Sequence, residues 1–198
     1  MNPPRGDAEG RRAAILDAAL RVFGQYGFRR TSMDDIAREA GIGKGTIYLS
    51  FGSKDEVFHG LSEALTERML AGASAAARMP GSTADKLAAM SAAWFGTYVE
   101  TIWRSPHAAE LMDAKHRLVA ELVAESSRRY KQLVQSVVAE GVVAGELNLE
   151  AARVTADVAA ELLIAGARGL ESSASTPEEY LRYLDALVRV MVAGFQHG

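Results

Sequence analysis

The sequence predicts an all-α protein, and three observations carry this prediction. Apolar residues recur at spacings of three and four along nearly the whole chain, which is the period of an α-helix. The alternation of apolar and polar residues that indicates a half-buried strand does not extend over any segment. Proline and glycine interrupt the helical pattern at Pro80-Gly81 and at Ser105-Pro106, so the chain divides into several helices.

Composition excludes several classes of protein. The chain has 198 residues and no cysteine, which removes disulfides, cysteine nucleophiles and thiolate zinc sites and fits a cytoplasmic location. No apolar run reaches the length of a membrane-spanning helix. The net charge is −3, but residues 1–60 carry 9 Lys and Arg against 8 Asp and Glu, whereas the rest of the chain carries 13 against 17. This asymmetry predicts different roles for the two parts.

The first two helices are predicted from their periodicity and their caps. Residues 1–9 are polar and are expected to form a disordered arm. The following stretch, GRRAAILDAALRVFGQYGF, has one apolar stripe, and Gly27 suits its C-terminal end. In TSMDDIAREAGIG, Thr31 or Ser32 suits the N-cap, and Gly41 ends a short helix.

The remaining helices follow from the same signals. GKGTIYLSF permits a second short helix, and SKDE, residues 53–56, reads as a capping box that opens a long helix. An apolar helix after Pro80-Gly81 suits the middle of a bundle. The predicted helices after the second short one are 53–79, 83–103, 115–143, 150–170 and 177–195.

GIGKGT, residues 41–46, has the glycines and the lysine of a phosphate-binding loop but not its pattern. A Walker loop has Ser or Thr directly after its lysine and lies between a strand and a helix. Here Gly45 follows Lys44, and the preceding segment is helical. A short capped helix, a glycine turn and a second short helix instead predict a helix-turn-helix, whose second helix enters the major groove of DNA.

The run TSMDDIAREAGIGKGTIYLSFGSKDEVF, residues 31–58, resembles the DNA-binding region of the TetR family of transcriptional regulators. Three motifs carry the resemblance and occur in the order of that family: I–A–x–x–A–G, K–G–T–I–Y and F–x–S–K. The resemblance covers about residues 10–60. It implies a three-helix helix-turn-helix domain at 10–55. A helical effector-binding and dimerisation domain at 56–198 would follow.

The resemblance also implies which residues bind DNA. Lys44 and Gly45 begin the recognition helix, where a lysine side chain and bare backbone reach base edges such as guanine O6 and N7. Leu49 and Ser50 replace the aromatic or histidine that the family often has there, so the half-site sequence stays open. Tyr48 has an alternative role as a core residue. The residues expected to bind DNA are Thr31, Lys44, Gly45, Thr46, Tyr48, Ser50 and Lys54, of which Thr31, Thr46, Tyr48 and Lys54 would contact phosphates.

An aromatic stripe on the apolar helix at 83–103 is the candidate effector site. Such a stripe is more often plain core, but helices at this place enclose the effector in TetR-like regulators. Aromatic and methionine side chains suit an apolar or aromatic small molecule. The expected effector-binding residues are Met90, Trp94, Tyr98 and Trp103.

The last two helices are the candidate dimer interface. Small residues permit close approach of helices, and the final helix has a wide apolar face, so two helices from each subunit would form a four-helix bundle. The alternative is that this face packs only within its own subunit. The expected interface residues are Leu163, Gly166, Leu184, Val188 and Met191.

Together these patterns predict a homodimeric, ligand-responsive DNA-binding regulator. The expected form is a repressor that a small-molecule effector releases from a palindromic operator, with an activator as the other direction. No nucleophile–base set and no metal-ligand spacing is found, so no enzyme, metal or cofactor is expected. The alternative is a small-molecule-binding helical carrier protein without DNA binding.

Overall fold

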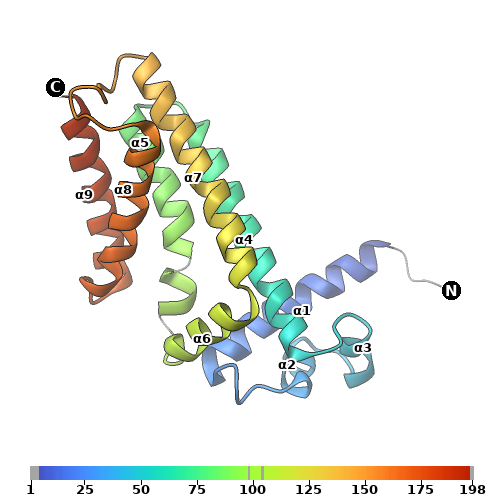
Figure 1. The fold of residues 1–198 in the computed structure, drawn as a ribbon. Coiled ribbons are helices and arrows are strands. Elements are labelled where there is room, and N and C mark those ends of the chain that lie inside the picture. The colour runs from blue at the N-terminus through green and yellow to red at the C-terminus, as the bar shows by residue number, and fades with distance from the viewer. Residues whose placement is uncertain (1–4, 98, 104, 197–198) are drawn as a thin grey trace. The chain divides into compact units, whose positions relative to one another are not determined.

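The computed structural model describes residues 5–97, 99–103 and 105–196, and every regular element in them is helical (Figure 1). The α-helices are α1 (Arg5–Tyr26), α2 (Met33–Glu39), α3 (Lys44–Tyr48), α4 (Lys54–Ala77), α5 (Thr83–Ser91), α6 (Ala108–Leu118), α7 (Ala120–Val143), α8 (Ala156–Gly169) and α9 (Pro177–Gln196). Two π-helical segments, η1 (Ala92–Gly96) and η2 (Val99–Trp103), follow α5, and a 3₁₀ turn, η3 (Leu170–Ser172), follows α8. The all-α prediction is confirmed. Within these residues no helix is both long and apolar enough to cross a bilayer.

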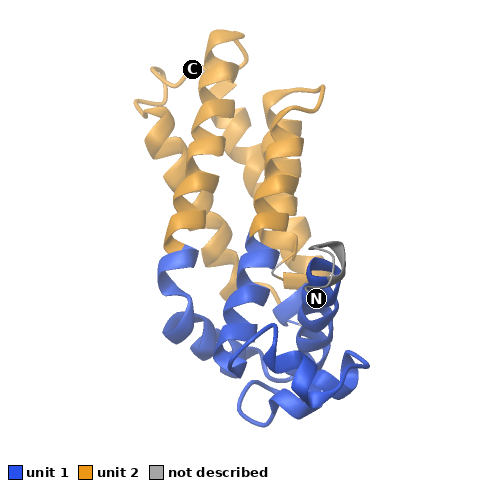
Figure 2. Cartoon of the chain, turned by 90° about the vertical axis from the view of Figure 1, so that its right-hand side faces the viewer, with its two compact units in different colours: residues 1–66, 101–123 blue, residues 67–100, 124–198 orange. Residues whose placement is uncertain are grey.

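The chain forms two compact units, each made from separate stretches of sequence (Figure 2). The first unit contains residues 1–66 and 101–123, and the second contains residues 67–100 and 124–198. This division differs from the predicted domains, which placed everything after residue 55 in one body. The reason is that α6 and its neighbours belong to the apolar core of the first unit.

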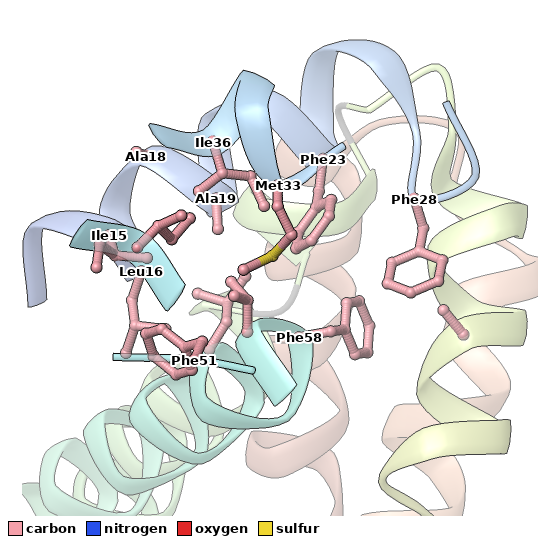
Figure 3. Close-up of a cluster of buried hydrophobic side chains, with 14 of the residues drawn as sticks. Ile15, Leu16, Ala18, Ala19, Phe23, Phe28, Met33, Ile36, Phe51 and Phe58 are labelled. Carbon is pink, nitrogen blue, oxygen red and sulfur yellow. The ribbon is translucent and has the colours of Figure 1, made fainter. Parts of the chain in front are cut away.

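Three phenylalanines belong to the core of the first unit (Figure 3). The ring centroids of Phe23, Phe28 and Phe58 lie 5.2–5.7 Å apart, and both pairs that include Phe58 meet edge to face, which aromatic quadrupoles favour. α6 adds Leu111 and Ala114 to this core. The helix-turn-helix segment therefore rests on α1, α4 and α6 together.

The beginning of α1 corrects one prediction, and its end confirms another. Residues 5–9 were expected in a disordered arm, but α1 begins at Arg5. Alanine and glutamate, as in Ala8-Glu9, are good helix formers, and an acidic residue near a helix N-terminus is stabilising. Gly27 has φ +83° and ends the helix, as its left-handed conformation predicts.

Two later helices also differ from their predicted bounds. The single helix expected at 115–143 is divided into α6 and α7 by Val119, whose φ of −135° leaves the helical path while its side chain is buried in the first unit's core. The helix expected from residue 150 begins at Ala156, because Thr155 accepts from the Val158 N–H at 3.2 Å and caps it. The last helix matches its predicted range within one residue.

The second unit packs α5 and α8 against α9. The Tyr180 hydroxyl of α9 donates to the Ala167 carbonyl of α8 at 3.1 Å, deep in the core. Leu163, Leu184 and Val188 are buried among these helices. The apolar face of α9 is thus occupied largely within the chain.

Candidate nucleic-acid interface

The turn between α2 and α3 explains the glycines of GIGKGT. The Ile42 N–H donates to the Ala37 carbonyl at 3.0 Å and the Gly41 N–H to the Arg38 carbonyl at 3.2 Å, a Schellman ending that requires a left-handed residue. Gly41 supplies it with φ +67°. The chain then enters α3 within three residues, so the loop is the turn of a helix-turn-helix.

Ser32, not Thr31, caps α2. The Ser32 hydroxyl accepts from the Asp35 N–H, and the Asp35 carboxylate accepts from the Ser32 N–H at 3.0 Å. These bonds to Ser32, with a smaller effect of Arg38, lower the pKa of the Asp35 carboxyl. Thr31 is only 3% exposed, and its hydroxyl donates to the Gly27 carbonyl at 2.7 Å. In the DNA-free chain the Thr31 side chain thus shapes the loop before α2, and its expected phosphate contact stays a prediction.

α3 turns one side chain inward and presents the others to solvent. Ile47 is fully buried in the first unit's core and fixes the rotation of the helix. Tyr48 is 47% exposed and Leu49 is 83% exposed, so Tyr48 is not a core residue. The Lys44 ammonium is exposed and donates to the Asp34 carboxylate at 2.8 Å, a bond that raises the pKa of Lys44. Thr46 and Ser50 are half-buried.

The end of α3 is held from α1. The Arg12 guanidinium lies 4.1 Å over the Phe51 ring and donates to the Ser50 carbonyl at 3.4 Å. Its contacts depend on residues about 40 positions away, which no local pattern indicates.

Gly45 is the residue of α3 that the fold does not require. A Cβ built at Gly45 meets no atom within 4 Å, and its φ lies outside the left-handed region. Glycine inside a helix costs about 1 kcal/mol relative to alanine. An exposed glycine that serves neither a turn nor a close internal contact suits a place where another molecule approaches the backbone.

Lys54 is engaged inside the chain. Its ammonium donates to the carbonyls of Phe28 and Thr31 at 2.7 and 2.8 Å, and to that of Arg29 at 3.3 Å. It also lies 4.5 Å from the centroid of the Phe28 ring. Burial lowers the pKa of the Lys54 ammonium. In the DNA-free chain Lys54 thus holds the loop between α1 and α2, and its expected phosphate contact stays a prediction.

The segment that begins α6 satisfies the last carbonyls of α1. The Ser105 hydroxyl donates to the Gly24 carbonyl at 2.7 Å. The His107 ring Nε2 lies 3.2 Å from the Gln25 carbonyl and is the donor there, because a carbonyl only accepts. Helix C-terminal carbonyls lack partners within their own helix, so these side chains complete the end of α1.

Glu110 meets the same loop from α6. Its carboxylate accepts from the Arg29 N–H, and a Cβ at Gly27 would lie 2.6 Å from Glu110 Oε2. Gly27 therefore needs to be glycine for both its φ and its neighbour. Sequence reasoning missed Glu110, because its partners lie about 80 residues away along the chain.

Comparison with known proteins identifies the family. Residues 15–61 match the model of the bacterial regulatory proteins of the tetR family. The HTH-type transcriptional regulator BetI of Agrobacterium fabrum is 30% identical over 148 residues, which cover 68% of this chain and 72% of that protein. The chain belongs to the TetR family. It is a DNA-binding transcriptional regulator, so the alternative of a carrier without DNA binding is wrong.

Two further proteins match this chain over different shares of its length. The HTH-type transcriptional regulator YhgD of Bacillus subtilis is 42% identical over 59 residues, covering 30% of this chain but only 31% of that protein. A crystal structure of a TetR/AcrR-family regulator from Thermobifida fusca is 28% identical with a TM-score of 0.67, covering 93% of this chain and 98% of that one. TetR-family proteins bind DNA and act as dimers, and these relatives are regulators rather than enzymes.

The predicted effector residues of this TetR-family protein belong to different units. Met90 is fully buried, and Trp94 is 8% exposed and stacks on Tyr130 with ring centroids 4.6 Å apart. Trp103 is half-buried and belongs to the first unit, whereas Met90 and Trp94 belong to the second. Tyr98 lies outside the described residues. Their role in binding an effector stays a prediction.

The second unit contains a small void of about 10 Å³ between α5, α7, α8 and α9. It is lined by apolar side chains, including Leu87, Leu163, Val188, Met191 and Phe195. A void of this size holds at most one water molecule, and an apolar one stays dry. Of the predicted effector residues that the structure describes, Met90, Trp94 and Trp103 do not line it. In the described part of the chain, no three His, Asp or Glu side chains are grouped to hold a metal ion.

The predicted dimer residues lie on the inner side of α8 and α9. Leu163, Leu184 and Val188 are buried within the chain, and Met191 lines the void. A Cβ at Gly166 would lie 2.8 Å from a methyl group of Leu187, so this glycine serves the packing of α8 on α9. Leu163, Leu184 and Val188 are therefore core residues within one chain, and the interface role of all five positions stays a prediction. The wide apolar stripe was the right pattern for burial, but the chain buries it itself.

Proposed function

We propose that this protein is a homodimeric repressor in which two copies of α3 enter successive major grooves of a palindromic operator. A small-molecule effector releases it from DNA. The observation that carries the proposal is the exposed face of α3, where Lys44 and Tyr48 flank a glycine that the fold does not require. Backbone at Gly45 then approaches the DNA closely, while Thr46 and Tyr48 contact phosphates. This role places the protein in the cytoplasm, with the DNA.

The operator is found by affinity selection. Genomic fragments, including the DNA that flanks the gene, are incubated with the protein at a stated salt concentration and the bound fraction is sequenced. We expect a palindrome whose half-sites lie about one helical turn apart. Recovery of non-palindromic sequence alone would contradict the dimeric arrangement.

Gly45→Ala separates stability from DNA binding. The substitution is expected to raise the free energy of unfolding by about 0.5–1 kcal/mol, because alanine loses less conformational entropy and its Cβ meets open space. The same methyl group should weaken binding to the selected fragment about tenfold or more, because it enters the space taken by DNA. Denaturant unfolding and a DNA titration measure the two effects.

The matched control is Gly24→Ala. Gly24 lies inside α1, and a Cβ there also meets no atom within 4 Å. It should give a similar gain in stability and leave DNA affinity unchanged. If both variants bind DNA as the native chain does, Gly45 is not at the interface.

The dimer surface is better sought on the outer side of α8 and α9. Val158 and Leu162 lie on α8 with Ala165 one further turn along, and all three are exposed. Val190 on α9 is 72% exposed, and Ala186 is exposed one turn before it. A stripe of this kind on two packed helices suits a four-helix bundle with the same stripe of a second subunit.

Leu162→Glu is expected to convert the dimer to a monomer of 21.2 kDa, because Leu162 is 50% exposed in one chain and two carboxylates would face each other across the axis. Light scattering after size exclusion measures the mass. Val143→Glu makes the same change at an exposed valine that ends α7 and should leave the dimer intact. A Leu162→Glu protein with the mass of the native assembly would place the interface elsewhere.

The effector is proposed to be an apolar or aromatic small molecule that binds in the second unit. Trp94 and Phe95 of η1 both contact Tyr130, so aromatic surface gathers at a π-helical segment, and such segments are frequent at functional sites. The effector must bind one conformation better than the other to shift the population away from DNA. Addition of an effector should therefore lower affinity for the selected fragment, whereas a rise would indicate an activator or a co-repressor.

A further inference from the structure

The helix-turn-helix carries more acidic than basic side chains. Residues 31–50 contain two basic residues, Arg38 and Lys44, and three acidic ones. Asp35 is bonded to Ser32 and Arg38, which are its neighbours on α2. A segment that contacts DNA thus has a net charge of −1, and its acidic side chains need an explanation.

Each acid of α2 has a defined partner, and the three partners differ in kind. Asp35 completes the cap of its own helix, and Glu39 pairs with Arg21 of α1 at 2.7 Å. Asp34 instead pairs with Lys44, the cation of α3, with Nζ and Oδ2 2.8 Å apart. Both side chains are exposed, so this pair lies on the surface that α3 presents.

The pair changes what the lysine does when it meets DNA. A free ammonium is attracted to every phosphate, whatever the sequence, and contributes to non-specific affinity. An ammonium paired with a carboxylate is largely neutralised. The pair is exposed and therefore weak, so another acceptor can replace Asp34. Guanine O6 and N7 offer two adjacent acceptors in the major groove, whereas the base pairs without guanine do not.

We propose that Asp34 is a specificity-determining residue: its carboxylate offsets the charge with which Lys44 attracts any phosphate, and the two adjacent acceptors of a guanine edge replace it where α3 enters the major groove. Asp34 thereby suppresses sequence-independent binding more than operator binding. The proposal rests on DNA binding through α3, as given under the proposed function. It assigns to α2 a part in sequence selection that does not require contact between α2 and a base.

Asp34→Asn tests the proposal, because it removes the charge and keeps the shape. Two probes are used: the duplex with the highest affinity selected by the native protein, and a pool of random-sequence duplexes of about three helical turns. Affinities are measured between about 50 and 200 mM salt. We expect affinity for the random pool to rise about 3- to 10-fold and the slope of log K against log salt to steepen by about one per subunit. Affinity for the selected duplex should change less, so the ratio of the selected-duplex affinity to the random-pool affinity falls.

Three variants assign the effect to the pair. Asp113→Asn makes the same change at an exposed position of α6 in the same unit and should leave the ratio unchanged. Asp34→Glu keeps the charge and should preserve the ratio. In a Lys44→Met background, Asp34→Asn should change the affinity for the random pool little. An equal rise in that affinity without the lysine would overturn the proposal, because simple repulsion of phosphate by Asp34 does not need Lys44.

The outcomes separate this inference from the proposed function. A native protein that selects no sequence above the random pool overturns both. If the native protein selects a sequence but Asp34→Asn leaves the ratio of the two affinities unchanged, only the role of Asp34 is overturned. Circular dichroism checks that each variant is folded, and Asp34→Ser serves as a second neutral substitution that suits the first turn of α2.

Discussion

Lys54→Met is expected to lower the free energy of unfolding of the DNA-free protein by about 2–3 kcal/mol. The reason is that one ammonium serves three backbone carbonyls of the loop between α1 and α2, and methionine leaves them without this donor. Hydrogen bonds from a charged donor contribute more than neutral ones. Because the loop leads into α2, DNA binding should weaken as well. Denaturant unfolding without DNA is the decisive measurement.

Lys44→Met is the matched control, since it removes an ammonium from the same unit. Lys44 is exposed, and its one ion pair with Asp34 is of the kind that contributes about 0–1 kcal/mol. It should leave unfolding nearly unchanged while altering the DNA sequences that are selected. The two lysines thus have opposite expected signatures. Unchanged stability of Lys54→Met, together with a lower salt dependence of DNA binding, would instead support the predicted phosphate contact of Lys54.

Trp94→Ala should destabilise the protein by about 3–5 kcal/mol. Trp94 is buried and stacks on Tyr130 with an angle of 6° between the ring planes, and Phe95 meets the same ring edge-on. Burial raises the pKa of Tyr130, so its hydroxyl stays neutral and the stack remains uncharged. Truncation to alanine removes both the ring contacts and the buried area. Thermal unfolding followed by circular dichroism measures the loss.

The size of this effect decides how an effector role is tested. Trp94→Phe retains an aromatic ring and should cost much less, so an altered effector response in that variant reports on binding rather than on folding. Tyr26→Ala, at a half-exposed aromatic residue of α1, is the control for aromatic truncation and should cost less than about 1 kcal/mol. A Trp94→Ala protein as stable as the native one would show that the stack contributes little to the fold.

The sequence predicted the helix-turn-helix because its signals are local. The Gly41 turn, the cap at residues 31–32 and the inward Ile47 each depend on residues within one or two turns. The break at Val119 was missed for the opposite reason. No proline or glycine marks it, and it follows from burial of one valine in a core built by distant segments.

The roles of individual side chains were less predictable than the helices that carry them. Lys54 and Thr31 belong to a motif that suggests DNA contact. In the structure, however, the Thr31 hydroxyl donates to a carbonyl four residues earlier, and the Lys54 ammonium donates to one 26 residues earlier. Glu110 gave no signal at all. On α8 and α9, periodicity identified the wide apolar stripe but not whether one chain or two would bury it. Which stripe stays exposed depends on how α5 and α9 meet, and that is a property of the tertiary structure.

The discontinuous first unit sets a rule for exchanging DNA specificity between regulators. Leu111 and Ala114 complete the core beneath the helix-turn-helix, and Glu110 satisfies the backbone of the loop before α2. A transplant of residues 1–66 alone would carry an uncovered apolar surface and unpaired backbone groups into its host. The portable module is residues 1–66 together with 101–123, so a working chimaera has three junctions with the receiving chain rather than one.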